Sequence, residues 1–538
     1  MSKSLGNFFT IREQLAREEA RHGGRKTTPS SNHQLFSDCL ENYIIKNFHY
    51  SRREAVSYVK FRNNLKFEKS SKHKGTRVVM FPPFRFRNSG LLFTSSAVVN
   101  KLTKLETQIQ IRKTIRPSVP TPNHLRSLKL SLFDQLAPPI YSPLLFYYLP
   151  SSEWNRAKNT ERCDKLQKSL AETLAKFYPL AGRHRKDDFS IQCNDEGVEY
   201  VETKVNADLA EFIREEPEVE FLENLLPWRV PRRTDLSSSP LLGIQVNKFN
   251  CGGLVMGIQI SHVLADAFTL GTFFNEWVHV SKTGTTKGCV PCFDQLSSLF
   301  PARVLSGPQF SLPSNMGAKI VTRSFVFDAS ALANLKDRIE KSTRVVSVMA
   351  LIWKVLTGIS SAKHGHSRDS TLVFAMNMRG KTKLPSLEHA LGNFCVAAFA
   401  TLEANQTRKE LNDFVNLVRS SSKDTSAHIG KASVEDITSM FVNYSPHGQK
   451  NETDIYLCSS LCRFPWYEAD FGWGKPSWVN TISKNVEMIS LIDTKNGEGI
   501  EARVSLNEND MAEFENDPDI LTFCPPQKQH SIPRFGQK

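Results

Sequence analysis

From about residue 108 onward, hydrophobic positions recur with two different periods. Residues 161 to 178 carry apolar side chains on a single helical stripe, which predicts an amphipathic helix that ends near Pro179: Leu166, Leu170, Leu174 and Phe177. FSIQC and VEYVE alternate apolar and polar residues on either side of NDEG, which predicts a hairpin. A second strand pair is predicted over residues 241 to 261, followed by the helix AFTLGTFFNEWVHV. Both strands and helices are therefore expected in this part.

The same mixture returns after a connection rich in glycine and proline at residues 281 to 315. VTRSFVF alternates like a strand, Asp328 is placed to cap the helix that follows, and STLVFAMNM is again strand-like. Helices interleaved with strands on both sides of the connection predict an α/β fold in two halves. We place the two domains at residues 108–300 and 301–538.

The first 107 residues differ in composition from the rest of the chain. Of the net charge of +14, residues 1 to 100 contribute +11, with 18 Lys and Arg against 7 Asp and Glu. Lys, Arg, Ser and Asn crowd together in KFEKSSKHKGTRVVMFPPFRFRNSG without a sustained hydrophobic period. Residues 1–107 are therefore predicted to be a basic extension, either disordered or fused in error, and the charge says little about the other residues.

The opening stretch MSKSLGNFFTIREQL resembles the KMSKS loop of cysteinyl-tRNA synthetase, with the leading lysine absent. That loop serves ATP binding only beside a nucleotide-binding domain, and none precedes it here. We expect no synthetase activity. The chain also lacks an apolar run long enough to span a bilayer and the layout of a secretory signal, so a cytoplasmic protein with reduced cysteines is expected.

A histidine and an aspartate stand where a predicted strand gives way to a helix, in QISHVLADAFTL. By strand parity His262 continues the face of Met256, Ile258 and Ile260, and the following helix packs beside it. A histidine held by two packed elements is a good general base, because its side chain is largely neutral at pH 7 and accepts a proton. Asp266, one turn away, is placed to fix the loop.

A second motif, DFGWGKP at 470 to 476, has two glycines that let the backbone turn sharply between aromatic residues. In this order and spacing, HVLAD and DFGWGKP resemble the BAHD acyltransferases of plant specialised metabolism. YPLAGR, NMRGK and LGNF support this resemblance, which covers residues 108 to 538, and the stretch PTPNHLRSLKLSLFDQLAPPIY is most similar to the vinorine synthase branch. Many members have glycine where this chain has Ala267, a change that we expect activity to survive.

The resemblance implies two chloramphenicol acetyltransferase-like domains with a channel at their interface. An acyl-CoA, expected to be acetyl-CoA, and a small-molecule alcohol such as an alkaloid would meet there, with His262 as general base and no acyl-enzyme, metal or permanently bound cofactor. Asp266 would orient the site and pair with an arginine, for which Arg379 is the candidate. A structural loop would be formed by Asp470, Phe471, Gly472, Trp473 and Gly474. The enzyme is expected to be a monomer.

Three alternatives stay open at this point. The chain is a degenerate family member that binds metabolites or protein partners, or its basic arm binds RNA, or an amine replaces the alcohol as acceptor. Cys289 and Cys292 form a CxxC pair, but no second pair lies at the spacing of a zinc ribbon, so no metal site is expected.

Overall fold

The computed structural model describes residues 106–150, 156–230, 238–288, 291–304, 319–381, 387–406, 410–431, 433, 436 and 453–525. These residues belong to one compact unit of the chain, Ser96–Lys538. Almost all of the predicted basic extension lies outside the described residues, as does Cys289 of the CxxC pair. The described part contains two six-stranded sheets and one small three-stranded sheet.

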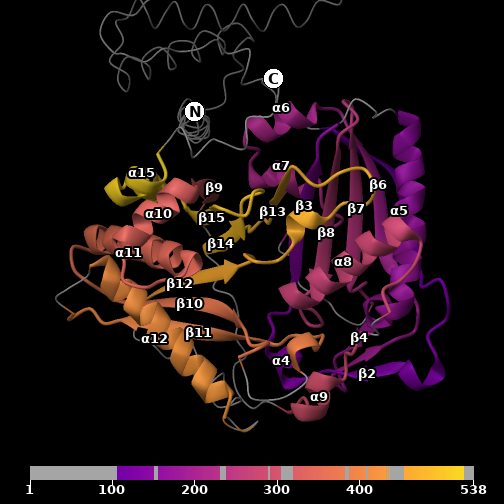
Figure 1. Ribbon diagram of the computed structural model, residues 1–538, viewed down its shortest axis with the longest axis horizontal. Helices are drawn as coiled ribbons and strands as arrows, with labels where there is room; N and C mark the ends of the chain where they lie inside the picture. The colour runs from indigo at the N-terminus through magenta and orange to yellow at the C-terminus, as the bar shows by residue number, and fades with distance from the viewer. Residues whose placement is uncertain are drawn as a thin grey trace, which may run out of the picture. The chain divides into compact units, whose positions relative to one another are not determined.

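The first sheet has the strand order β1-β6-β7-β8-β3-β13 (Figure 1). Its strands are β1 (Thr107–Ile115), β3 (Tyr141–Tyr148), β6 (Val198–Val205), β7 (Leu242–Phe249), β8 (Leu254–Ser261) and β13 (Trp478–Asn480). Alternate residues of β3 enter different cores, because successive side chains point to opposite faces. Phe146 packs with α5 (Arg156–Lys176) and α8 (Ala267–Thr283), whereas Tyr147 packs with α6 (Leu209–Arg214) and α7 (Val219–Glu223). Helices therefore cover both faces of this sheet.

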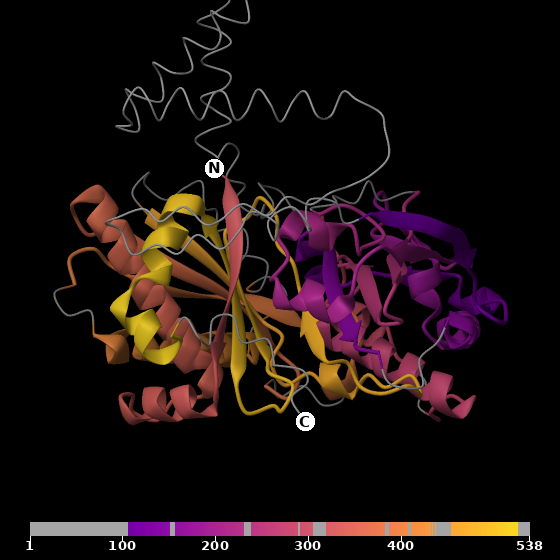
Figure 2. The same ribbon diagram turned by 90° about the horizontal axis from the view of Figure 1, so that it is seen from above.

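The second sheet has the order β11-β10-β12-β14-β15-β9. Its strands are β9 (Ile320–Phe327), β10 (Asp369–Asn377), β11 (Cys395–Leu402), β12 (Thr453–Ser460), β14 (Met488–Asp493) and β15 (Ile500–Asn507). Its helices, which share one hydrophobic core with it, are α10 (Ala329–Asp337), α11 (Arg344–His364), α12 (Leu411–Ile429), α14 (Glu508–Glu515) and α15 (Pro518–Phe523). Figure 2 shows these helices gathered on the outer side of the second sheet, away from the first sheet.

Strand β13 joins the two halves of the chain. It follows the DFGWG motif in sequence, yet it pairs antiparallel with β3 of the first sheet, Val479 lying opposite Phe146. A division of the sequence at residue 300 does not anticipate this exchange, because three residues are too short to stand out as a strand by periodicity. The predicted domain boundaries themselves stay a prediction.

One predicted pairing is wrong. FSIQC and VEYVE do not form a hairpin: β5 (Ser190–Gln192) pairs with β2 (Ser127–Lys129) and β4 (Arg183–Arg185) in the small sheet, whereas β6 lies in the first sheet. Gly197 in the connection has φ of +90°, and a Cβ there would lie 2.4 Å from the carbonyl oxygen of Ile115. The chain therefore passes tightly against the end of β1 and pairs with that strand instead.

The remaining short helices are α4 (Leu132–Leu136) and α9 (Gln295–Leu299). Among the described residues, one helix, α11, is long and apolar enough to cross a membrane by length and composition alone. However, 61% of its apolar window is buried inside the protein, where it packs beneath the second sheet, so its composition is weak evidence for a membrane span.

Candidate active site

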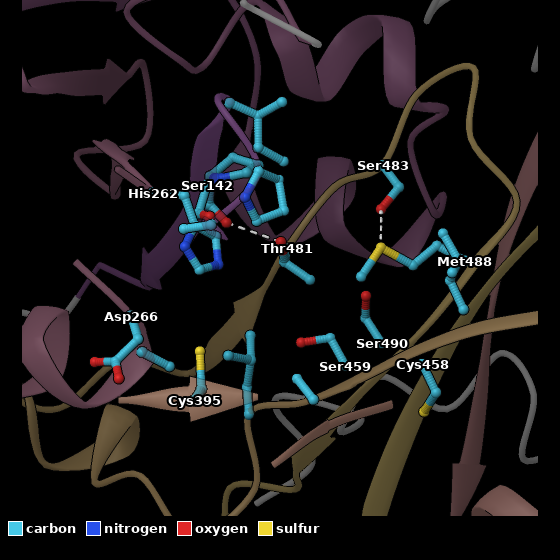
Figure 3. A pocket seen from close by; sticks show the side chains of 18 of the residues that line it. Ser142, His262, Asp266, Cys395, Cys458, Ser459, Thr481, Ser483, Met488 and Ser490 are labelled. Atoms are coloured by element: carbon cyan, nitrogen blue, oxygen red, sulfur yellow. Dashed lines mark hydrogen bonds between the residues drawn. The ribbon is translucent and has the colours of Figure 1, made fainter. Parts of the chain in front are cut away.

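A mostly apolar cavity of about 310 Å³ lies between the two sheets. Its walls come from β3 and the end of β8 on one side and from β10, β11, β12 and β14 on the other. Figure 3 shows Ser142 and His262 from the first side and Cys395, Ser459 and Ser490 from the second. Hydroxyl groups provide most of its uncharged polar lining: Ser142, Ser459, Thr481, Ser483 and Ser490. His262 and Asp266 line the same cavity. The structure thus brings both residues of the first motif to a cavity between the halves.

His262 follows directly after β8 and is held through its backbone and its ring. Its backbone N–H donates to the carbonyl oxygen of Ile140 at 2.9 Å. Its ring Nδ1 lies 3.1 Å from Oδ1 of Asn393, whose side-chain Nδ2 in turn donates to the carbonyl oxygen of His262 at 2.7 Å. Asn393 therefore contacts His262 at two points, the ring Nδ1 and the backbone carbonyl. The other ring nitrogen of His262, Nε2, has no hydrogen bond to any residue in the described ranges.

Asn393 is itself anchored by Asp134, a buried carboxylate at the start of α4. The backbone N–H and the side-chain Nδ2 of Asn393 both donate to Oδ1 of Asp134, at 2.7 and 2.9 Å. Oδ2 accepts hydrogen bonds from the backbone N–H and the hydroxyl of Ser131, at 2.9 and 2.7 Å. Burial raises the pKa of Asp134 to about 6, even though all four hydrogen bonds act to lower it.

Asp266 holds the loop rather than the reacting atoms. One of its oxygens caps α8 by accepting from the N–H of Thr269 at 2.9 Å. The other accepts from the N–H of Phe394 at 3.0 Å and from Nη1 of Arg379 at 2.6 Å. The side chains of Asp266 and Arg379 are only 6% and 4% exposed. Both carboxylate oxygens are thus committed to protein donors and stabilise the loop that carries His262.

Arg379, which belongs to the C-terminal half of the chain, binds to the loop that carries His262 and Asp266. Besides its ion pair with Asp266, its Nε donates to the carbonyl oxygen of Ala390 at 2.9 Å, and its Nη2 donates to that of Gly392 at 3.0 Å. The guanidinium also lies 4.3 Å from the centre of the Phe268 ring, within the range of a cation–π contact. The arginine in NMRGK is therefore placed beside Asp266, as the resemblance led us to expect.

The DFGWG residues form a loop that supports the first sheet. Oδ1 of Asp470 accepts from the N–H groups of Gly472 and Gly474 at 2.9 and 2.8 Å, and Oδ2 pairs with Lys282 at the end of α8. Both glycines have positive φ, at 105° and 109°, a backbone conformation that other residues adopt with strain. Phe471 is fully buried against aromatic residues of α8, and the Trp473 ring stacks on the Phe471 ring.

Burial acts to raise the pKa of Asp470, but the donors from Gly472, Lys282 and Gly474 outweigh it and hold the pKa below its ordinary value. None of the five motif residues lines the cavity that contains His262. The loop therefore acts on the site indirectly, by fixing the end of α8 and the path into β13.

A second, more open cavity of about 1170 Å³ adjoins the first, since Phe374 and Ala375 line both. It is lined by α8, α12 and the first residues of α11, and it carries cationic side chains and no acidic residue among its described lining: Arg379, Lys381, Arg419, Lys423 and Arg463. A basic cavity beside a helix N-terminus is suited to bind phosphate groups.

No group of three or more His, Cys, Asp or Glu side chains within the described ranges is arranged to hold a metal ion. Cys292 of the CxxC pair instead donates to Asp294 at 3.0 Å.

Asn393 and Asp134 were missed as site residues by the sequence reasoning. LGNF, which contains Asn393, supports the family resemblance but carries no local sign of a role beside His262. SLFD contains the spacing of a capping box, with Ser131 and Asp134 bonded to one another's backbone at the start of α4, and this signal could have drawn attention to the aspartate. Their proximity to His262 has no local signal, because Asn393 is 131 residues from His262 in sequence and Asp134 is 259 residues from Asn393.

The chain is similar in sequence to known acyl-transferring enzymes along most of its length. A family model described as Transferase family matches residues 105–521. An acetyl-CoA-benzylalcohol acetyltransferase of Clarkia breweri is 35% identical over 437 residues, which is 77% of this chain and 98% of that protein. A stemmadenine O-acetyltransferase of Catharanthus roseus is 32% identical over 423 residues, covering 76% of this chain and 96% of that protein.

Among solved structures, vinorine synthase superposes with a TM-score of 0.67 at 29% identity, covering 78% of this chain and 98% of that one. TRI101 of F. sporotrichioides, in complex with coenzyme A and T-2, gives a TM-score of 0.56 at 18% identity, covering 74% of this chain and 98% of that one, and so shares the fold. The two-domain α/β fold expected from the sequence is confirmed. The chain belongs to the Transferase family, that of the BAHD acyltransferases.

Proposed function

We propose that the protein transfers the acetyl group of acetyl-CoA to a hydroxyl of an uncharged, largely apolar small metabolite, with His262 as general base. The observation that carries this proposal is the position of His262, at the wall of an apolar cavity that adjoins a basic cavity. A base between an apolar binding site and a phosphate-binding site is what transfer from a CoA thioester to an alcohol requires.

In the proposed reaction, the acceptor oxygen attacks the carbonyl carbon of the thioester while its proton passes to Nε2 of His262. An alcohol is too weak an acid for imidazole to ionise it in advance, so proton transfer accompanies attack, and such help contributes about 10² to 10⁴ in rate. The tetrahedral intermediate then expels the CoA sulfur, which takes the proton back from the imidazolium. Ester and CoA thiol leave, and the histidine is neutral again.

The basic cavity is the proposed seat of the CoA nucleotide, whose phosphates are anionic. Lys381, Arg419, Lys423 and Arg463 supply positive charge there, and Thr343 caps α11 at its wall, so the helix N-terminus faces the same space. The thioester arm would reach His262 past Phe374 and Ala375, which both cavities share.

The apolar cavity indicates the charge of the acceptor. Among its described lining residues the only acid is Asp266, which is neutralised by Arg379, and the only cation is Lys484, which pairs with Glu223. A protonated amine would find no free carboxylate in this part of the lining, and its burial without one is costly. We therefore favour a neutral alcohol with an aromatic or terpenoid skeleton. Acetyltransferases of benzyl alcohol and of limonoids are among the similar proteins.

The test uses the full-length chain with two donors, acetyl-CoA and S-acetyl-N-acetylcysteamine, which keeps the thioester but lacks phosphates. Ester formation is followed by mass spectrometry with benzyl alcohol and a panel of neutral terpenoid alcohols and amines. We expect transfer from acetyl-CoA to a neutral alcohol, and a KM for acetyl-CoA that rises at least about tenfold in Arg419→Ala/Lys423→Ala. The KM for the short donor should not change in that variant.

Two outcomes would contradict the proposal. If no acyl-CoA yields ester or amide with any acceptor while the folded protein still binds small alcohols, the degenerate binding protein is the better description. If amines react and alcohols do not, the acceptor class is wrong. Cytoplasmic location and a monomeric state stay predictions from the sequence.

A further inference from the structure

We propose that Asn393, anchored by Asp134, is the positioning residue that fixes both the tautomer and the orientation of the His262 ring. The inference rests on the proposed function, in which His262 is the base, and adds the residues that make its Nε2 the atom that accepts the proton. Neither residue touches the reacting atoms in this scheme. Their effect passes through the imidazole.

The orientation of the Asn393 amide follows from its surroundings. Its Nδ2 faces two acceptors, Oδ1 of Asp134 at 2.9 Å and the carbonyl oxygen of His262 at 2.7 Å, so both amide hydrogens are used. The flipped amide would place an oxygen against a carboxylate and a carbonyl, which is repulsive. The amide oxygen must therefore face Nδ1 of His262, 3.1 Å away.

An amide oxygen only accepts hydrogen bonds, so Nδ1 must carry the hydrogen at this contact. A neutral imidazole has one N–H, and its other nitrogen, Nε2, therefore holds the lone pair. This is the nitrogen without a partner among the described residues, in a side chain that lines the cavity. The network thus selects the tautomer that general-base catalysis needs before substrate arrives.

Asp134 makes the arrangement rigid. Because its Oδ1 accepts from both the backbone and the side chain of Asn393, the asparagine cannot turn about χ1 without losing a buried hydrogen bond. Its Oδ2 is fixed by the capping box with Ser131. The chain of contacts joins the start of α4, the segment before β11 and the end of β8, so the base is assembled only when the two halves dock.

The use of an amide rather than a carboxylate beside the ring has a chemical consequence. A carboxylate at position 393 would stabilise the imidazolium and favour a protonated histidine near neutral pH. The neutral amide orients the ring without that effect, while the negative charge of Asp134 stays one residue further away. The base is therefore oriented and remains free to accept a proton.

The direct test is ¹⁵N NMR on the full-length protein labelled at histidine, with the His262 resonances assigned by comparison with His262→Gln. We expect neutral His262 to carry its proton on Nδ1. A proton on Nε2 in the wild-type protein would overturn the proposal. This measurement needs no turnover. A protein that shows the Nδ1–H form but has no transferase activity would contradict the proposed function and leave the role of Asn393 intact.

Asn393→Leu removes the acceptor at nearly the same shape, and Asn516→Leu, at the exposed end of α14, is the matched control. We expect kcat of Asn393→Leu to fall about 10²-fold with KM for acetyl-CoA within about threefold, and both His262 tautomers to appear. Asn393→Ala removes the amide with less bulk beside Asp134 than leucine has and should show the same mixture of tautomers, so it tests the idea even where the leucine variant does not fold. A folded Asn393→Leu or Asn393→Ala variant with unchanged kcat and an unchanged His262 tautomer would overturn the proposal.

Discussion

Burying the charged carboxylate of Asp134 lowers the stability of the folded protein, and the substitution Asp134→Asn tests how this effect depends on pH. Asp134 is only 5% exposed, and this burial raises its pKa from an ordinary 3.8 to about 6. The difference of about 2 pKa units corresponds to about 3 kcal/mol of folding free energy. Asparagine has nearly the same shape but no charge to desolvate.

The sign of the effect follows from the direction of the shift. A carboxyl whose pKa is higher in the folded than in the unfolded state binds its proton more tightly when folded. Its contribution to stability is therefore full below pH 3.8 and is lost as the pH rises through about 6. The asparagine variant has no such loss. The unfolding free energy of Asp134→Asn minus that of the wild type should therefore rise by about 2 kcal/mol between pH 4 and pH 7.

Urea titrations of both full-length proteins at several pH values between 4 and 7.5 measure this difference. The contributions of other titrating groups to the pH dependence are the same in both proteins and largely cancel in the difference. His262, Cys395 and the Asp266–Arg379 pair lie close to Asp134, so the comparison requires that the substitution leave their protonation unchanged. Asp188→Asn is the matched control, because hydrogen bonds from Ser190 and Lys129 hold the pKa of that exposed aspartate below its ordinary value. Its difference from the wild type should change with pH in the opposite direction.

A difference between Asp134→Asn and the wild type that stays constant with pH, within about 1 kcal/mol, would refute this reasoning. The variant should at the same time lose turnover, because the hold of Asn393 on His262 weakens. Loss of rate, together with a stability that falls less with rising pH than that of the wild type, is the expected pattern for a residue kept for function.

Three further variants test the supporting structure. Arg379→Met leaves the Asp266 carboxylate buried and unpaired and should lower the unfolding free energy by about 3–5 kcal/mol in urea titrations; a loss below about 1 kcal/mol would contradict the buried pair. Asp470→Asn should lower the melting temperature measured by calorimetry, because it removes the ion pair with Lys282 and the negative charge that strengthens the hydrogen bonds from the two glycine N–H groups, while KM for acetyl-CoA is retained in the folded fraction; an unchanged melting temperature would contradict its structural role. Gly257→Ala should sharply reduce the yield of folded protein, because its Cβ would lie 2.1 Å from the carbonyl oxygen of Leu225; wild-type yield would show that the two elements can separate.

Local patterns predicted most of the elements around the site. The alternation through Ile260 and the apolar stripe after Asp266 predicted β8 and α8. Asp266 was expected to fix the loop, and its role as the N-cap of α8 was not predicted. These features depend on neighbours in sequence, where periodicity and capping carry the information. The position of Arg379 was reached by resemblance rather than by any pattern in the residues.

Contacts between distant segments were the part that could not be predicted. β13 is too short for a periodic signal, and β5 and β6 looked like a hairpin because nothing local reveals which sheet a strand joins. Asn393 approaches His262 only through the docking of the two sheets, so its partner is set by tertiary packing. The cations of the second cavity likewise converge from α12 and from loops that are far apart in sequence.

The imidazole of His262 is the group on which the proposed reaction depends most directly. Its role is tested by the turnover of purified His262→Ala with acetyl-CoA and a neutral alcohol that the wild type acetylates. We expect kcat to fall by about 10² to 10⁴, with the melting temperature and the KM for acetyl-CoA close to those of the wild type. A folded variant that keeps turnover within about threefold of the wild type would show that the acceptor proton leaves by another route, and His262 would not be the base.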